Sequence, residues 1–202
     1  MIQGFIPGPR DFAAYVYKIR YSVYAVALLM LLSFLIGVVF AATMPDETAR
    51  ILSLISSQME DIQSDSSFGL MINLFVHNAA ICLVMVLLGL ALGLISLLIV
   101  FDNGLMIGLV GGAVAGKAGL VFTLAAILPH GVIELPMLVL SAAIGVHLGY
   151  CVLMALFRKP ISMLDELKNG LLVFAVWVVP LLLVAAFVES YITTALVYFL
   201  TQ

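Results

Sequence analysis

One uninterrupted run of apolar residues limits what this chain can fold into. Residues 21–42 contain no charged side chain. As an α-helix this run is about 33 Å long, and the hydrocarbon core of a bilayer is about 30 Å thick. Over the whole chain 65% of residues are hydrophobic and 9% are charged, against roughly half and a quarter in soluble domains. Such a chain cannot cover its apolar surface with polar side chains, so we predict an all-α integral membrane protein.

Further apolar runs predict a transmembrane helical bundle of five or six spans in a single domain covering residues 1–202. Turn and charge signals at Pro45, Asp102-Asn103-Gly104, Pro129-His130-Gly131 and Arg158-Lys159-Pro160 separate the runs. The predicted spans are residues 21–42, 68–101, 105–128, 132–157 and 171–188. The more polar segments 11–20, 46–66 and 161–169 are expected at the membrane surface. The tail 190–202 is too short to assign as a sixth span.

The placement of lysine and arginine predicts an orientation in the cell membrane. Five spans put six of these residues on one side, and Arg50 alone on the other, with Lys117 inside a span. The six are Arg10, Lys18, Arg20, Arg158, Lys159 and Lys168. Cytoplasmic loops are rich in lysine and arginine, so we expect a cytoplasmic N-terminus. The net charge of −3 and the absence of a basic block argue against nucleic-acid binding.

Polar side chains within the predicted spans gather in the outer half of the membrane. This candidate cluster comprises Asn73, His77, Asn78, His130, Glu134 and Glu189. Asn73 and His77 share one helix face at i, i+4, and so do His130 and Glu134. Ionisable groups at membrane depth are costly, which makes them candidates for function.

Three interpretations of this cluster remain open. The groups can hydrogen-bond to one another and hold the helices in register. They can form a binding or proton-relay site in a transporter. His77, His130 and Glu134 can also act as metal ligands, since histidine and carboxylate are zinc ligands. The sequence has no H-E-x-x-H motif, which argues against a zincin-type protease.

Other polar and small residues have separate roles. His147 lies 17 residues after His130, about 25 Å along a helix, so we expect a structural histidine at the opposite end. Lys117 is predicted at membrane depth, where it either lines a cavity or snorkels to the surface. Gly108, Gly112 and Gly116 form successive G-x-x-x-G pairs, which favour close packing of helices.

Several of these motifs together resemble a known family. They are Asn73 and Asn78, Asn103-Gly104, Pro129-His130-Gly131-x-x-Glu134-Leu135 and Glu189-x-x-Ile192-Thr193. The pattern is similar to the stage II sporulation protein M family and covers nearly the whole chain from about Tyr21. The resemblance implies a five-span membrane protein. It also implies a scaffold role, because the family's named member works with peptidoglycan-degrading partners during engulfment.

The sequence therefore predicts a non-enzymatic scaffold that packs with itself or with other membrane proteins in the lipid bilayer. We expect no cofactor. A small transporter or channel is the alternative, and an intramembrane metal-dependent enzyme is the third hypothesis. A polar cavity joining Glu134 to Lys117 would favour transport, whereas dry packing would favour the scaffold.

Overall fold

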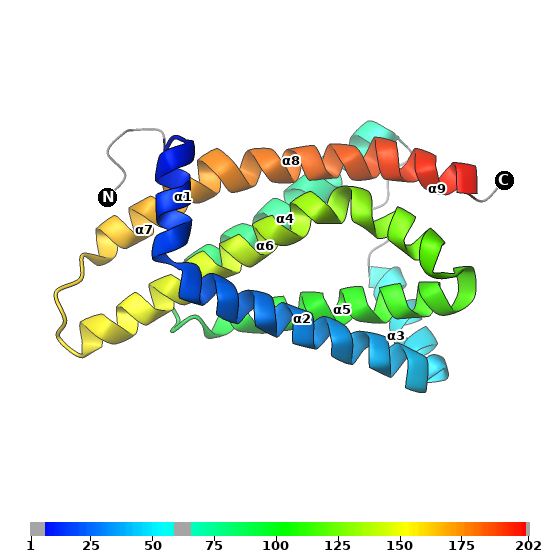
Figure 1. Ribbon diagram of the computed structural model, residues 1–202, viewed down its shortest axis with the longest axis horizontal. Helices are drawn as coiled ribbons and strands as arrows, with labels where there is room; N and C mark the ends of the chain where they lie inside the picture. The colour runs from blue at the N-terminus through cyan, green and yellow to red at the C-terminus, as the bar shows by residue number, and fades with distance from the viewer. Residues whose placement is uncertain (1–6, 59–65, 201–202) are drawn as a thin grey trace.

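The computed structural model describes residues 7–58 and 66–200, in which every regular element is a helix (Figure 1). The first half contains α1 (Pro9–Lys18), α2 (Arg20–Thr43), α3 (Pro45–Gln58) and α4 (Ser67–Leu88). The second half contains α5 (Leu94–Ala118), α6 (Leu120–Leu156), α7 (Met163–Val173), α8 (Val179–Phe187) and α9 (Thr194–Leu200). Two π-helical turns, η2 (Phe174–Val178) and η3 (Val188–Thr193), join α7, α8 and α9 into one continuous helix.

Five helices are long and apolar enough to cross a membrane, as the sequence predicts. They are α2, α4, α5, α6 and the continuous helix Met163–Leu200. They run roughly side by side along the long axis of the molecule (Figure 1). We name the end that carries α1, the α4–α5 turn and the α6–α7 loop the α1 end. The opposite end, which carries α3 and α9, is the α3 end.

The predicted surface segment 11–20 is a separate helix, α1, which crosses the α1 end of the bundle (Figure 1). Its apolar face packs inward, with the Phe12 and Trp177 ring centroids 4.7 Å apart. Tyr15 is also buried. The Trp177 indole Nε1 donates a hydrogen bond to the Pro7 carbonyl oxygen at 3.1 Å. These contacts dock α1 on the last span.

The predicted small-residue face of α5 is used within the chain, against α2. A Cβ on Gly108 would lie 3.0 Å from the Gly37 Cα and even closer to the Phe34 carbonyl oxygen. A Cβ on Gly112 would lie 2.9 Å from the Ala41 Cβ. Gly116, by contrast, faces open space. Close backbone approach is how helices gain packing energy in lipid, so these glycines set the α2–α5 seam.

The predicted single span 68–101 is wrong, because α4 ends at Leu88 and α5 begins at Leu94. Leu92 and Gly93 have φ values of 57° and 75°, which reverse the chain. The turn rests on α6, where a Cβ on Gly89 would overlap the backbone of Gly145. The turn contains no polar residue, so the hydropathy of the sequence does not reveal it.

The predicted turn at Asp102-Asn103-Gly104 is also wrong, because all three residues lie inside α5. The Asn103 side-chain nitrogen donates to the Ile99 carbonyl oxygen at 2.8 Å, one turn back along the helix. Gly104 is buried against Ser33 of α2. These contacts within α5 and with α2 override the local preference of the three residues for a turn.

The predicted break at Pro129-His130-Gly131, and with it the boundaries 105–128 and 132–157, also differs from the structure. The chain turns earlier, at Gly119 with a φ of 86°, and α6 runs through both Pro129 and Pro136. A proline inside a helix removes one backbone hydrogen bond and bends it. α6 is accordingly curved, and its first turns lie beside the end of α5 (Figure 1).

The last span is longer than the predicted 171–188, because it begins at Met163 and continues to Leu200. Most of the predicted surface segment 161–169 is therefore its first turns. The π-turn η2 comes just before Pro180, where the proline cannot donate a backbone hydrogen bond. The surface segment 46–66 corresponds to α3 over its first part, and residues 59–65 lie outside the described ranges.

Candidate functional site

The structure brings three of the predicted polar residues together between α6 and the last span. His130 and Glu134 lie one turn apart on α6, and Glu189 faces them from η3. One ligand atom from each residue lies within 4.8 Å of the others. The His130 Nδ1 atom also lies 3.4 Å from the Thr193 hydroxyl oxygen. These four residues form what we name the α6–η3 cluster.

The π-turn η3 supplies the polar side chains of the last span. Ser190 and Thr193 are buried, and the Ser190 hydroxyl has no hydrogen-bond partner within the described part of the chain. A π-turn widens the helix by one residue and is frequent at functional sites. Here it turns Glu189, Ser190 and Thr193 toward α6.

The residue types of the α6–η3 cluster could hold a cation. Two carboxylates close together in a medium of low dielectric repel each other unless a positive charge or a proton lies between them. A charged His130 or a bound divalent cation would supply that charge, since imidazole and carboxylate are both suitable ligands. The same groups can equally hold α6 and the last span in register.

The remaining members of the predicted cluster do not join it. His77 is exposed on α4 and is not grouped with the other ligands, so the proposed metal set of His77, His130 and Glu134 is not brought together. Glu189 takes the place of His77. Asn73 and Asn78 are half-buried on α4. The packing of a helix, and not the depth of a residue alone, decides which of its side chains face the bundle interior.

Lys117 lies in the last turn of α5 and is exposed, so the prediction of a lysine deep in the span is wrong. The chain turns at Gly119, about two residues later. The lysine therefore sits at the α3 end, where its ammonium group can reach water.

Asp102 is a membrane-depth charge that the turn prediction misses. It lies eight positions after Leu94, about 12 Å along α5. Its side chain is exposed in a groove of about 500 Å³ between α4 and α5. The groove is otherwise lined by Ala80, Ile81, Val84, Leu98, Ile99 and Asn103. Within residues 7–58 and 66–200 no side chain forms an ion pair or hydrogen bond with this carboxylate.

A second, larger cavity is apolar. It has a volume of about 540 Å³ and lies between α2, α5 and the first half of α6. Its walls include Phe34, Gly111, Ile127 and Leu135, and no lining residue is charged. The cavity includes neither Glu134 nor Lys117 in its lining, so it does not join the α6–η3 cluster to the lysine.

The sequence model of the stage II sporulation protein M family matches residues 26–194. This range is most of the 202-residue chain, and the chain therefore belongs to this family of membrane proteins. The matched range contains all four residues of the α6–η3 cluster and Asp102. No curated protein and no solved structure matches the chain.

Proposed function

We propose that the chain is a non-enzymatic membrane scaffold that binds the transmembrane helix of a partner protein in the groove between α4 and α5. The observation that carries this proposal is the exposed Asp102 carboxylate at membrane depth. Membership of the stage II sporulation protein M family agrees with a role among other membrane proteins.

The depth of Asp102 favours a binding partner on energetic grounds. α5 has 25 residues and is about 37 Å long, so its ends extend about 4 Å beyond a centred hydrocarbon core. Asp102 then lies about 8 Å inside the apolar layer. A charged aspartate in a spanning helix costs about 3 kcal/mol on the insertion scale. A cationic side chain in the same groove would offset much of this cost.

We expect this cation to come from another protein. Among residues 7–58 and 66–200, no lysine or arginine lies within a span at the depth of Asp102. Lys117, on the same helix, is about 22 Å further along. A second copy in the same orientation would hold its own lysine at that same wrong depth. We therefore expect a partner helix that is apolar except for one lysine or arginine.

The proposed orientation places the α1 end in the cytoplasm. That end carries Arg10, Lys18, Arg20, Arg158, Lys159 and Lys168, whereas Arg50 and Lys117 are at the α3 end. The excess of positive charge at the α1 end supports this assignment. A maleimide reagent that cannot cross membranes should label a cysteine introduced at exposed Glu47 in intact cells, but not one introduced at Lys159.

Photo-crosslinking from the groove tests the scaffold proposal. A photoreactive residue replaces Leu98 of α5 or Val84 of α4, both of which line the groove and are exposed. The control is Leu183 on α8, which is exposed and lies outside this groove. In native membranes both groove positions should give an adduct with the same protein, and mass spectrometry should place it on a spanning segment with a lysine or arginine.

The charge itself is tested with Asp102→Asn, and Asp165→Asn serves as a matched control on an exposed acid at the start of the last span. Asp102→Asn should reduce the adduct about tenfold or more, since about 1.4 kcal/mol corresponds to a factor of ten. Asp165→Asn should leave the adduct unchanged. Adducts with lipid alone, adducts between two copies of the chain, or an adduct insensitive to Asp102→Asn would each contradict the proposal.

Transport is the second candidate function, and the α6–η3 cluster is the observation that favours it. Converging ionisable groups between two spanning helices are typical of proton and ion pathways. Purified chain in proteoliposomes should then carry a proton or cation flux that Glu134→Gln and Glu189→Gln abolish. If no flux of protons, monovalent cations or divalent cations is detected, this candidate is excluded in favour of a structural role.

A further inference from the structure

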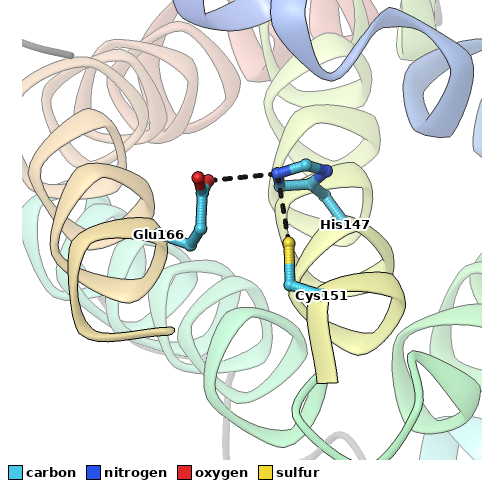
Figure 2. A group of neighbouring side chains, drawn as sticks. All are labelled: His147, Cys151 and Glu166. Carbon is cyan, nitrogen blue, oxygen red and sulfur yellow. Dashed lines mark hydrogen bonds and ion pairs between the residues drawn. The ribbon is translucent and has the colours of Figure 1, made fainter. Parts of the chain in front are cut away.

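A second group of side chains converges at the α1 end, far from the α6–η3 cluster. His147 and Cys151 lie one turn apart on α6, and Glu166 faces them from α7 (Figure 2). The His147 Nε2 atom lies 3.2 Å from a carboxylate oxygen of Glu166 and 3.6 Å from the Cys151 sulfur. All three ligand atoms lie within 4.8 Å of one another.

This arrangement does not suit a cysteine nucleophile. A relay of the cysteine–histidine–acid type uses both imidazole nitrogens, one toward the nucleophile and the other toward the carboxylate. Here the carboxylate and the sulfur both approach the same nitrogen, Nε2 (Figure 2). One ring nitrogen carries at most one proton, so it cannot serve both groups well. Three ligand atoms within 4.8 Å of one another can instead be held together by a metal ion.

We propose that His147, Cys151 and Glu166 form a zinc site that clamps α7 to α6. Tetrahedral zinc with bonds of about 2.0–2.3 Å sets nitrogen and oxygen ligands about 3.3 Å apart, and nitrogen and sulfur about 3.6 Å apart. The measured separations of 3.2 and 3.6 Å match both edges. A thiolate together with an imidazole selects zinc over magnesium or calcium, which prefer oxygen ligands.

A buried polar group without a partner lies near these three ligands. Tyr15 of α1 is 4% exposed, and its hydroxyl has no hydrogen-bond partner within the described part of the chain. Burial, with the charges of nearby Glu166 and Cys151, raises the pKa of Tyr15. A buried hydroxyl without a partner is costly. A water molecule held in the fourth zinc position would accept its hydrogen bond.

Lys18 is the competing cation at this position. Its Nζ atom lies 2.6 Å from both carboxylate oxygens of Glu166. The Lys18 side chain is 45% exposed, so it can turn toward water and leave one oxygen to the metal. Cys151 is buried, while His147 and Glu166 keep 13% and 17% of their side chains exposed. Metal would therefore enter from the Lys18 side.

Zinc binding to the purified full chain tests the proposal, and it does not depend on the scaffold function. The site should bind one equivalent of zinc. Cobalt(II) in its place should give a thiolate-to-metal charge-transfer absorption band. Cys151→Ser should remove this band, and Cys82→Ser, at the other buried cysteine, should keep it. His147→Gln and Glu166→Gln should lower zinc affinity about tenfold or more, the least that loss of supporting groups around zinc costs.

The protein without substitutions provides an independent measurement if a variant fails to fold. X-ray absorption of the zinc-loaded chain should show one sulfur among the ligands, which distinguishes this site from the sulfur-free α6–η3 cluster. Glu134→Gln should leave the cobalt charge-transfer band unchanged, because the α6–η3 cluster contains no cysteine. The proposal is overturned if no stoichiometric zinc binds, if the bound zinc has only nitrogen and oxygen ligands, or if the cobalt band survives in Cys151→Ser.

Discussion

Replacement of Gly108 by alanine tests the α2–α5 seam most directly. The added Cβ would lie 3.0 Å from the Gly37 Cα and closer still to the Phe34 carbonyl oxygen. Both neighbours are backbone atoms, which cannot rotate away as the end of a side chain could. The helices have to separate, and overpacking of a close-packed interior typically costs about 1–3 kcal/mol. Because the clash is with backbone, we expect the upper end of this range.

The matched control is Gly116→Ala, eight residues or about two helical turns further along α5. A Cβ on Gly116 meets no atom within 4 Å. Both substitutions gain the helix propensity of alanine over glycine, about 1 kcal/mol. The net expectation is a loss of about 2 kcal/mol for Gly108→Ala and a gain of up to about 1 kcal/mol for Gly116→Ala.

Unfolding of the purified chain in mixed detergent micelles measures the difference. The chain has a single tryptophan, Trp177, whose fluorescence reports on the packing of α1 against the last span. A separation of about 3 kcal/mol between the two variants is more than a hundredfold in the unfolding equilibrium. Equal stability of the two variants would refute the packing argument. So would a loss for Gly116→Ala as large as that for Gly108→Ala.

Three further substitutions test other parts of the fold. Gly119→Ala should cost about 1 kcal/mol or more in thermal unfolding, because Gly119 has a φ of 86°, where a side chain is strained. Trp177→Phe should cost about 1 kcal/mol in unfolding followed by circular dichroism, since it removes the hydrogen bond to Pro7 but keeps an aromatic ring against Phe12. Burial raises the pKa of Tyr15 above its ordinary 10.0, so the unfolded chain loses this proton first. Stability should therefore fall as pH rises above about 10, and Tyr15→Phe should show less of this fall in unfolding measured against pH.

The number and type of the helices could be predicted from the sequence because hydropathy is sufficient for both. The breaks between helices could not be predicted equally well. Asp102-Asn103-Gly104 has the local signature of a turn, yet the packing of Gly104 on α2 keeps it helical. The true turn at residues 89–93 is apolar, and it depends on glycines of α6 that are far away in the sequence. In both places tertiary contacts, and not local sequence preferences, decide whether the chain turns.

The candidate site was predictable in part. His130 and Glu134 are one helical turn apart, and the topology placed Glu189 at a similar depth, so their convergence could be expected. His77 shares that depth but faces outward, because depth does not determine which face of a helix is buried. The group at His147 was missed because its acid, Glu166, lies in a segment predicted to be on the surface. Asp102 could not be predicted as an intramembrane charge, because its local sequence is typical of a turn outside the membrane.

The two π-turns explain how one helix can reach α6 at both ends. Glu166 contacts His147, and Thr193 lies against His130. These two residues of the last span are 27 positions apart, so an ideal α-helix at about 100° per residue would put them on opposite faces, about 180° apart. Each π-turn adds one residue to a helical turn, which shifts the following face by about 100°. The turns η2 and η3 both lie within this interval, and together they bring Glu166 and Thr193 to within about 20° of one face.

Apolar contacts alone set register weakly in lipid, because the lipid competes for the same surface. The last span is therefore positioned on α6 by polar contacts near its two ends, and the π-turns are what allow both contacts to form at once.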